Sequence, residues 1–153
     1  NLQYECEVVL RICKNGKKIS ERHAHQYFDQ WTVGIDFTAR DVQNKLKNQG
    51  LPWEIAKAFD DSAVVGQFVP FQREELYSAN FSLDLNKEKV QTGTTADLIF
   101  SFEKLISYIS QYFTLQIGDL IFTGTPKGVG PVLPYDVLEG FLNNEKLFEV
   151  EIR

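Results

Sequence analysis

Short strand-like segments joined by brief connections dominate this chain and limit what it can fold into. Apolar and more polar side chains alternate along residues 4–12, which is the signature of a strand. Asn143 and Asn144 separate two other such segments and mark a hairpin turn. The strand-like segments run over 4–12, 31–37, 81–85, 89–92, 119–123, 137–142 and 146–152. Connections this short favour antiparallel pairing.

A few helices interrupt this β pattern. Ser20 predicts the start of a helix over 21–30, and Gly50 predicts the end of another over 39–48. A short helical piece is expected over 54–59, and apolar residues recur at helical spacing from Ser101 onward. We therefore predict an α+β fold that is mainly β, with mixed sheets, within one domain that spans residues 1–153.

Composition excludes several classes of protein. The net charge of −5 argues against nucleic acid as a partner, because phosphate binding requires clustered Lys and Arg. No apolar run approaches the roughly 18 residues that a membrane span requires. Cys6 and Cys13 fit neither a disulfide framework nor a zinc pattern, so reduced cysteines are expected. Without a signal peptide pattern, we expect a cytoplasmic protein.

Three acidic residues form the first candidate site. Glu5 and Glu7 lie two apart on a predicted strand, so both side chains point to one side. A divalent cation between them would offset their repulsion, and a solvated strand face with Arg11 as partner is the alternative. Asp36 lies in an otherwise apolar strand, where a carboxylate must be paired or metal-bound. The alternatives for Asp36 are a salt bridge to Arg40 or a position on the wet face of the strand beside Thr32 and Thr38.

Two basic side chains and a glycine-rich loop complete the candidates. Lys57 lies among small and apolar neighbours, which suits either a snorkelling surface lysine or a cation for a substrate carboxylate. Arg40 offers a planar fork for a carboxylate or simply begins a helix. The loop 124–130 is neither a Walker loop nor a dinucleotide fingerprint. It is either an anion-binding loop or a tight turn.

The order and spacing of four motifs resemble the fumarylacetoacetate hydrolase family, and most of all its small-chain branch of acylpyruvases, oxaloacetate decarboxylases and 2-hydroxyhepta-2,4-diene-1,7-dioate isomerases. The motifs are Glu5-Cys6-Glu7, Asp36-Phe37-Thr38-Ala39-Arg40-Asp41-Val42-Gln43, Gly50-Leu51-Pro52-Trp53 with Ala56-Lys57, and Gly118-Asp119 followed by residues 123–130. The resemblance runs through essentially the whole chain.

The resemblance implies a mixed β-roll, a homodimer and a bound Mg²⁺ or Mn²⁺. By resemblance, the metal ligands are Glu5, Glu7 and Asp36, and the catalytic residues are Lys57 and Arg40. By the same resemblance, the residues that contact substrate are Arg40, Gln43, Lys57, Gly124 and Thr125. The expected substrates are small 2-oxo acids.

The implied activity is a metal-dependent hydrolysis or decarboxylation of acylpyruvates or oxaloacetate through a metal-stabilised enolate. Isomerisation of a 2-hydroxydienoate in aromatic catabolism is one alternative, and an inactive metal-binding dimerisation domain is another. In the family, an N-terminal lid carries a His and a Glu that act as an acid/base dyad. Neither His23 nor His25 occupies the matching place, and Asn1 opens the chain. We therefore expect that the domain lacks its N-terminal portion.

Overall fold

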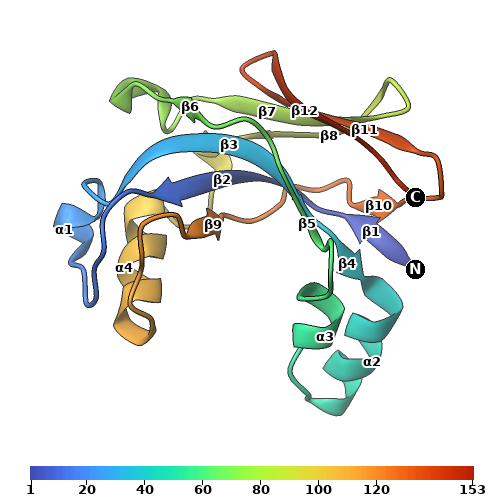
Figure 1. Cartoon of the computed structure of the whole chain (residues 1–153), viewed down its shortest axis with the longest axis horizontal. Coiled ribbons are helices and arrows are strands. Elements are labelled where there is room, and N and C mark those ends of the chain that lie inside the picture. Colours follow the sequence, from blue (N-terminus) through green and yellow to red (C-terminus); the bar gives the residue numbers. More distant parts are fainter.

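Two curved antiparallel sheets, one lying over the other, make up most of the computed structural model, which describes residues 1–153 (Figure 1). The central sheet has the order β5-β3-β2-β9, and a short strand, β6, also pairs with β3. Its strands are β2 (Cys6–Ile12), β3 (Phe28–Asp36), β5 (Ala63–Val65), β6 (Val69–Pro70) and β9 (Leu120–Phe122).

The second large sheet covers one face of the long β2–β3 pair. It has the order β12-β11-β7-β8, and every neighbouring pair is antiparallel. Its strands are β7 (Asn80–Leu85), β8 (Glu88–Thr94), β11 (Val137–Leu142) and β12 (Glu145–Glu151). A third, small sheet closes one end, with the strands β10 (Gly130–Pro131), β1 (Leu2–Tyr4) and β4 (Thr38–Ala39) in that order.

Four α-helices lie on the side of the central sheet that faces away from the second sheet, in two groups at opposite ends (Figure 1). The helices are α1 (Glu21–Ala24), α2 (Arg40–Gln49), α3 (Glu54–Lys57) and α4 (Phe102–Tyr112), and two 3₁₀ turns cover Arg73–Glu75 and Thr95–Asp97. None of the helices is long and apolar enough to cross a membrane. The mainly β fold with a few short helices is as predicted.

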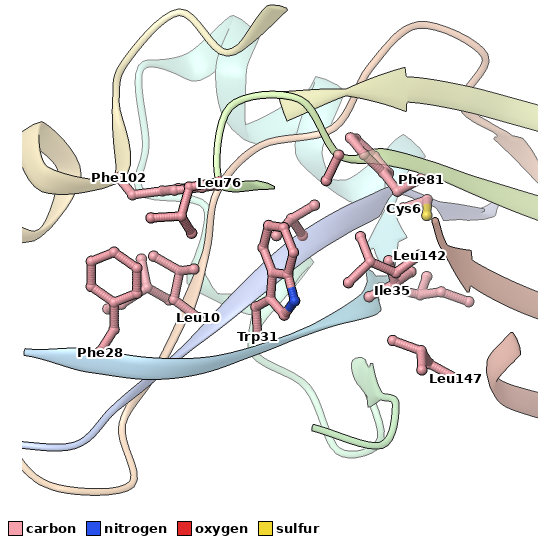
Figure 2. Close-up of a cluster of buried hydrophobic side chains, with 14 of the residues drawn as sticks. Cys6, Leu10, Phe28, Trp31, Ile35, Leu76, Phe81, Phe102, Leu142 and Leu147 are labelled. Carbon is pink, nitrogen blue, oxygen red and sulfur yellow. The ribbon is translucent and has the colours of Figure 1, made fainter. Parts of the chain in front are cut away.

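The hydrophobic core fills the space between the two large sheets and extends toward α4 (Figure 2). Trp31, Leu10 and Phe102 are among its largest fully buried side chains. Because Val8 and Val9 are both fully buried, β2 is covered on both faces. A strand covered on both faces forces any polar group on it into a partly enclosed position, which matters for the acids that flank Cys6.

Two expectations about individual elements need correction. The predicted helix over 21–30 ends at Ala24, and the Ser20 hydroxyl does not cap it. The following segment joins β3 instead, because Phe28 is buried against Phe71 and Phe102, and this packing outweighs local helix preference. The predicted strand over 4–12 is interrupted at Glu5, which separates β1 from β2.

Candidate metal centre

The fold brings the three predicted acids together where β2 and β3 run side by side. Cys6 pairs with Ile35, so Glu5 and Asp36 lie at neighbouring positions on adjacent chain segments. The backbone N–H of Asp36 donates to the Glu5 carbonyl at 2.9 Å. One carboxylate oxygen from each of Glu5, Glu7 and Asp36 lies within 4.8 Å of the others. The solvated-face alternative fails for Glu7, which is only 5% exposed.

Burial and crowding shift the pKa of each acid. Burial raises the pKa of Glu7 to about 7, against the Gly124 N–H that lowers it, with added upward shifts from Asp36 and Glu5. Burial also raises the pKa of Asp36 by more than its contact with Lys57 lowers it. Burial acts in the same direction on Glu5, but the hydrogen bonds from Lys57 and Arg40 outweigh it and leave the pKa below its usual value. The surroundings therefore disfavour the charged form of Glu7 and Asp36 and favour that of Glu5.

Lys57 reaches the acids from the last turn of α3. Its ammonium contacts Asp36 Oδ2 at 2.5 Å, Glu5 Oε2 at 3.0 Å and Thr38 Oγ1 at 2.7 Å. An ammonium has three N–H donors, so all of them are engaged in this structure. Lys57 is therefore the counter-ion of two of the three acids, and the alternative of a snorkelling surface lysine does not hold.

Arg40 begins α2 and holds its neighbours through a fork of hydrogen bonds. One arm bonds the Glu5 carboxylate, another donates to Gln43 Oε1 at 2.6 Å, and Nε donates to Gln3 Oε1 at 2.8 Å. The alternative salt bridge between Arg40 and Asp36 is not formed. Three of the five guanidinium N–H donors are engaged, which leaves two for a ligand.

The glycine-rich loop contacts the acid cluster from the end of β9. Gly124 has φ of +106°, and its N–H donates to Glu7 Oε2 at 2.6 Å. The Thr125 hydroxyl donates to the Cys6 carbonyl at 2.8 Å. The loop thus continues alongside β2 past the point where β9 ends, and it places a backbone donor on one of the acids.

Several residues at the site were not among the sequence candidates. Gln3 and Thr38 support Arg40 and Lys57, and Gln91 bonds Thr125 from the second sheet. Thr38 lies within the motif 36–43, whereas no spacing signal marks Gln3 or Gln91, because only the fold brings their segments to the site. His23 lies in α1, where its ring contacts Ser20 and Arg22 and not the acid cluster.

A cluster of three carboxylates is typical of a site for a divalent cation. Hard divalent cations such as Mg²⁺ and Mn²⁺ prefer carboxylate oxygens and commonly leave positions open for water and substrate. The partly enclosed carboxylates, one of which has a pKa raised to about 7 by burial, fit such a cation. The fold and the site thus define a mainly β protein with a three-carboxylate centre.

Comparison with known proteins places this architecture in a family. The whole chain, residues 1–153, matches the model described as fumarylacetoacetate (FAA) hydrolase C-terminal. The chain belongs to the fumarylacetoacetate hydrolase family, which confirms the prediction from its motifs.

Two relatives illustrate the family. Over 140 residues the chain is 43% identical to the mitochondrial oxaloacetate tautomerase FAHD1 of Mus musculus, and the match covers 91% of the chain and 63% of that relative. It is 36% identical over 140 residues to fumarylpyruvate hydrolase of a Ralstonia species, which covers 92% of the chain and 73% of the relative. The chain thus spans less than two thirds of the mouse protein.

A solved structure of similar fold contains ligands. The crystal structure of fumarylpyruvate hydrolase from Pseudomonas aeruginosa in complex with Mn²⁺ and pyruvate matches with a TM-score of 0.90 and 38% identity. The match covers all of this chain and 65% of that one. The agreement confirms the predicted fold class of the fumarylacetoacetate hydrolase type.

Proposed function

We propose that this protein is a divalent-metal-dependent enzyme that acts on small 2-oxo acids. The observation that carries the proposal is the three-carboxylate cluster with Lys57 and Arg40 beside it. The complex of the Pseudomonas relative with Mn²⁺ and pyruvate supports both the metal and the substrate class. Glu5, Glu7 and Asp36 would hold Mn²⁺ or Mg²⁺, and the cation would supply Lewis-acid stabilisation of charge on the 2-oxo oxygen.

Charge balance at the site favours an anionic substrate once a cation is present. With all three acids ionised, the carboxylates outnumber the two cations, Lys57 and Arg40, by one negative charge. A divalent cation reverses this excess to one positive charge. A 2-oxo acid carries a carboxylate next to its carbonyl, so the loaded cluster and the two free Arg40 donors would attract it.

Lys57 would have two roles, one toward the acids and one toward the substrate. With its three donors on Glu5, Asp36 and Thr38, the ammonium offsets part of the negative charge of the cluster. Ligation of Glu5 and Asp36 by a cation would release at least part of this contact, because the two positive groups compete for the same oxygens. The released ammonium would then hold the substrate carboxylate or move a proton at the carbon beside the carbonyl.

Two reaction types are compatible with these groups. Hydrolysis or decarboxylation of acylpyruvates or oxaloacetate is the first candidate, supported by the fumarylpyruvate hydrolases among the relatives. Proton transfer without bond cleavage, as in isomerisation or tautomerisation, is the second. The oxaloacetate tautomerase relative favours this second reaction.

The test is a set of parallel assays with Mn²⁺ and oxaloacetate, acetylpyruvate or fumarylpyruvate. We expect metal-dependent conversion of at least one compound. Release of pyruvate would identify cleavage, and a change in enol absorbance without pyruvate release would identify proton transfer. Conversion should disappear in Asp36→Asn and persist in Asp29→Asn, an exposed control at the opposite end of β3. Metal binding without any conversion would contradict the proposal and favour an inactive metal-binding domain.

A further inference from the structure

A buried glutamine on β8 connects the strand of the acids with the glycine-rich loop. Gln91 is only 2% exposed and lies on the second sheet, opposite Leu83. Its side-chain oxygen accepts from the backbone N–H of Cys6 at 2.9 Å. Its amide nitrogen donates to Thr125 Oγ1 at 3.0 Å and to the Pro126 carbonyl at 3.2 Å. Every polar group of this side chain therefore has a partner.

The residues that Gln91 bonds lie next in the sequence to residues that form or contact the acid cluster. Cys6 lies between Glu5 and Glu7, so its backbone position helps to set where both carboxylates begin. Thr125 follows Gly124, whose N–H bonds Glu7. The Thr125 hydroxyl also donates to the Cys6 carbonyl, which closes a ring of hydrogen bonds among Gln91, Cys6 and Thr125.

The direction of each bond in this ring is fixed by chemistry. A hydroxyl has one proton, and Thr125 gives it to the Cys6 carbonyl, so Thr125 must accept from the Gln91 amide. The Gln91 oxygen must in turn face the Cys6 N–H, because two N–H groups cannot bond each other. Only an amide at position 91 offers an acceptor for Cys6 and donors for the loop at once.

A second close approach ties the same loop to the same strand. Gly128 has φ of +101°, and a Cβ added there would lie 2.7 Å from the Val90 carbonyl oxygen and 3.3 Å from Gln91 Cγ. The loop backbone therefore rests directly on β8 at two points, the Gln91 amide and Gly128. A loop held at two points has little freedom to move away from β2.

We propose that Gln91 is a positioning residue that holds the Gly124–Pro126 backbone against β2 and thereby fixes the place of this loop beside the acid cluster. The effect on ligand affinity rests on the proposed function, whereas the effect on the loop does not. Gln91 lies behind Thr125 and contacts none of the three acids directly. It acts through Cys6, which lies between Glu5 and Glu7, and through Thr125, which follows Gly124.

The structural test is hydrogen exchange, measured by mass spectrometry on the metal-free protein. Gln91→Glu preserves size and the acceptor for Cys6, but its carboxyl group offers at most one O–H donor in place of the two N–H donors, and it loses that donor when it ionises. We expect faster exchange in residues 123–130 and unchanged exchange in β11 and β12. Gln30→Glu is the matched control, because Gln30 uses only its oxygen, as acceptor for Arg11. Unchanged exchange in residues 123–130 of Gln91→Glu would overturn the proposal.

The functional test is a calorimetric titration with Mn²⁺ and then with oxalate, a small dianion that resembles a 2-oxo acid. Gln91→Glu should lower oxalate affinity by about tenfold or more, as loss of outer support commonly does at metal sites, and should change Mn²⁺ affinity less. Thr125→Val breaks the same ring of hydrogen bonds at its loop residue. The double variant should therefore bind oxalate only slightly more weakly than either single variant. Full oxalate affinity in Gln91→Glu, or fully additive losses, would overturn the proposal. An unaltered protein that binds no Mn²⁺ would contradict the proposed function alone, and the exchange result would still decide the role of Gln91.

Discussion

At the scale of single residues, the candidate site depends on how two cations share three acids. Glu5 bonds both Arg40 and Lys57, whereas Glu7 bonds only the Gly124 N–H and keeps a pKa near 7. The identity of the acids was predictable from spacing and from the resemblance of the motifs. The contacts of Lys57 with Asp36 and Thr38 were not, because they depend on where α3 packs. The roles of Arg40, Gln43, Lys57, Gly124 and Thr125 toward substrate stay predictions.

Removal of the Lys57 charge should strengthen metal binding. Lys57→Met keeps a long apolar stem but removes a cation that contacts Asp36 at 2.5 Å and Glu5 at 3.0 Å. We expect Mn²⁺ affinity to rise by roughly tenfold and turnover of a 2-oxo acid to fall, because the competing charge and the substrate contact are lost together. Calorimetry and the pyruvate assay measure the two effects.

The matched control for this variant is Lys47→Met, which removes an exposed lysine from the last turn of α2. It should leave both Mn²⁺ affinity and turnover close to those of the unaltered protein. Weaker Mn²⁺ binding in Lys57→Met would contradict the account of Lys57 as a competing counter-ion. It would show that the lysine supports the cluster in some other way.

At the scale of elements, local sequence signals predicted some boundaries and tertiary packing decided others. Gly50 ends α2 in the left-handed region, and the Ser101 hydroxyl caps α4, as their positions in the sequence indicate. Packing of Phe28 into the core overrides the helix expected over 21–30. The short strands β5 and β6 carry no strong alternation and form only because β3 offers them an edge.

The contact between the glycine-rich loop and β8 predicts a stability effect at Gly128. A Cβ at this position meets the Val90 carbonyl at 2.7 Å, and φ of +101° strains any L side chain. Gly128→Ala should therefore lower the free energy of unfolding by about 2–4 kcal/mol, since backbone strain and a close contact add. Urea denaturation measures this change.

Gly50→Ala is the comparison for this variant. Gly50 also has a positive φ, of +66°, but no atom lies within 4 Å of its added Cβ. We expect a cost of only about 1–2 kcal/mol there, from the left-handed backbone alone. Equal costs at the two glycines would show that the loop is not pressed against β8 in solution.

At the scale of the whole molecule, the two sheets serve different purposes. The central sheet carries Glu7 and Asp36, and the second sheet buries the core and supplies Gln91 to the loop. The mainly β class followed from strand spacing, whereas the sheet order did not, because pairing such as β7 with β11 joins distant segments. A homodimer, a single domain over residues 1–153, a cytoplasmic location and magnesium as a metal of this site stay predictions.

The most direct test of the three-carboxylate centre is a calorimetric titration of the metal-free protein with Mn²⁺, with Asp36→Asn in parallel. We expect saturable binding at one site in the unaltered protein. Asp36→Asn should lose at least about tenfold in affinity, because it keeps the side-chain shape but removes the charge of one ligand. Circular dichroism should show the same fold for both proteins. No binding to the folded protein, or equal binding by Asp36→Asn, would contradict the three-carboxylate centre.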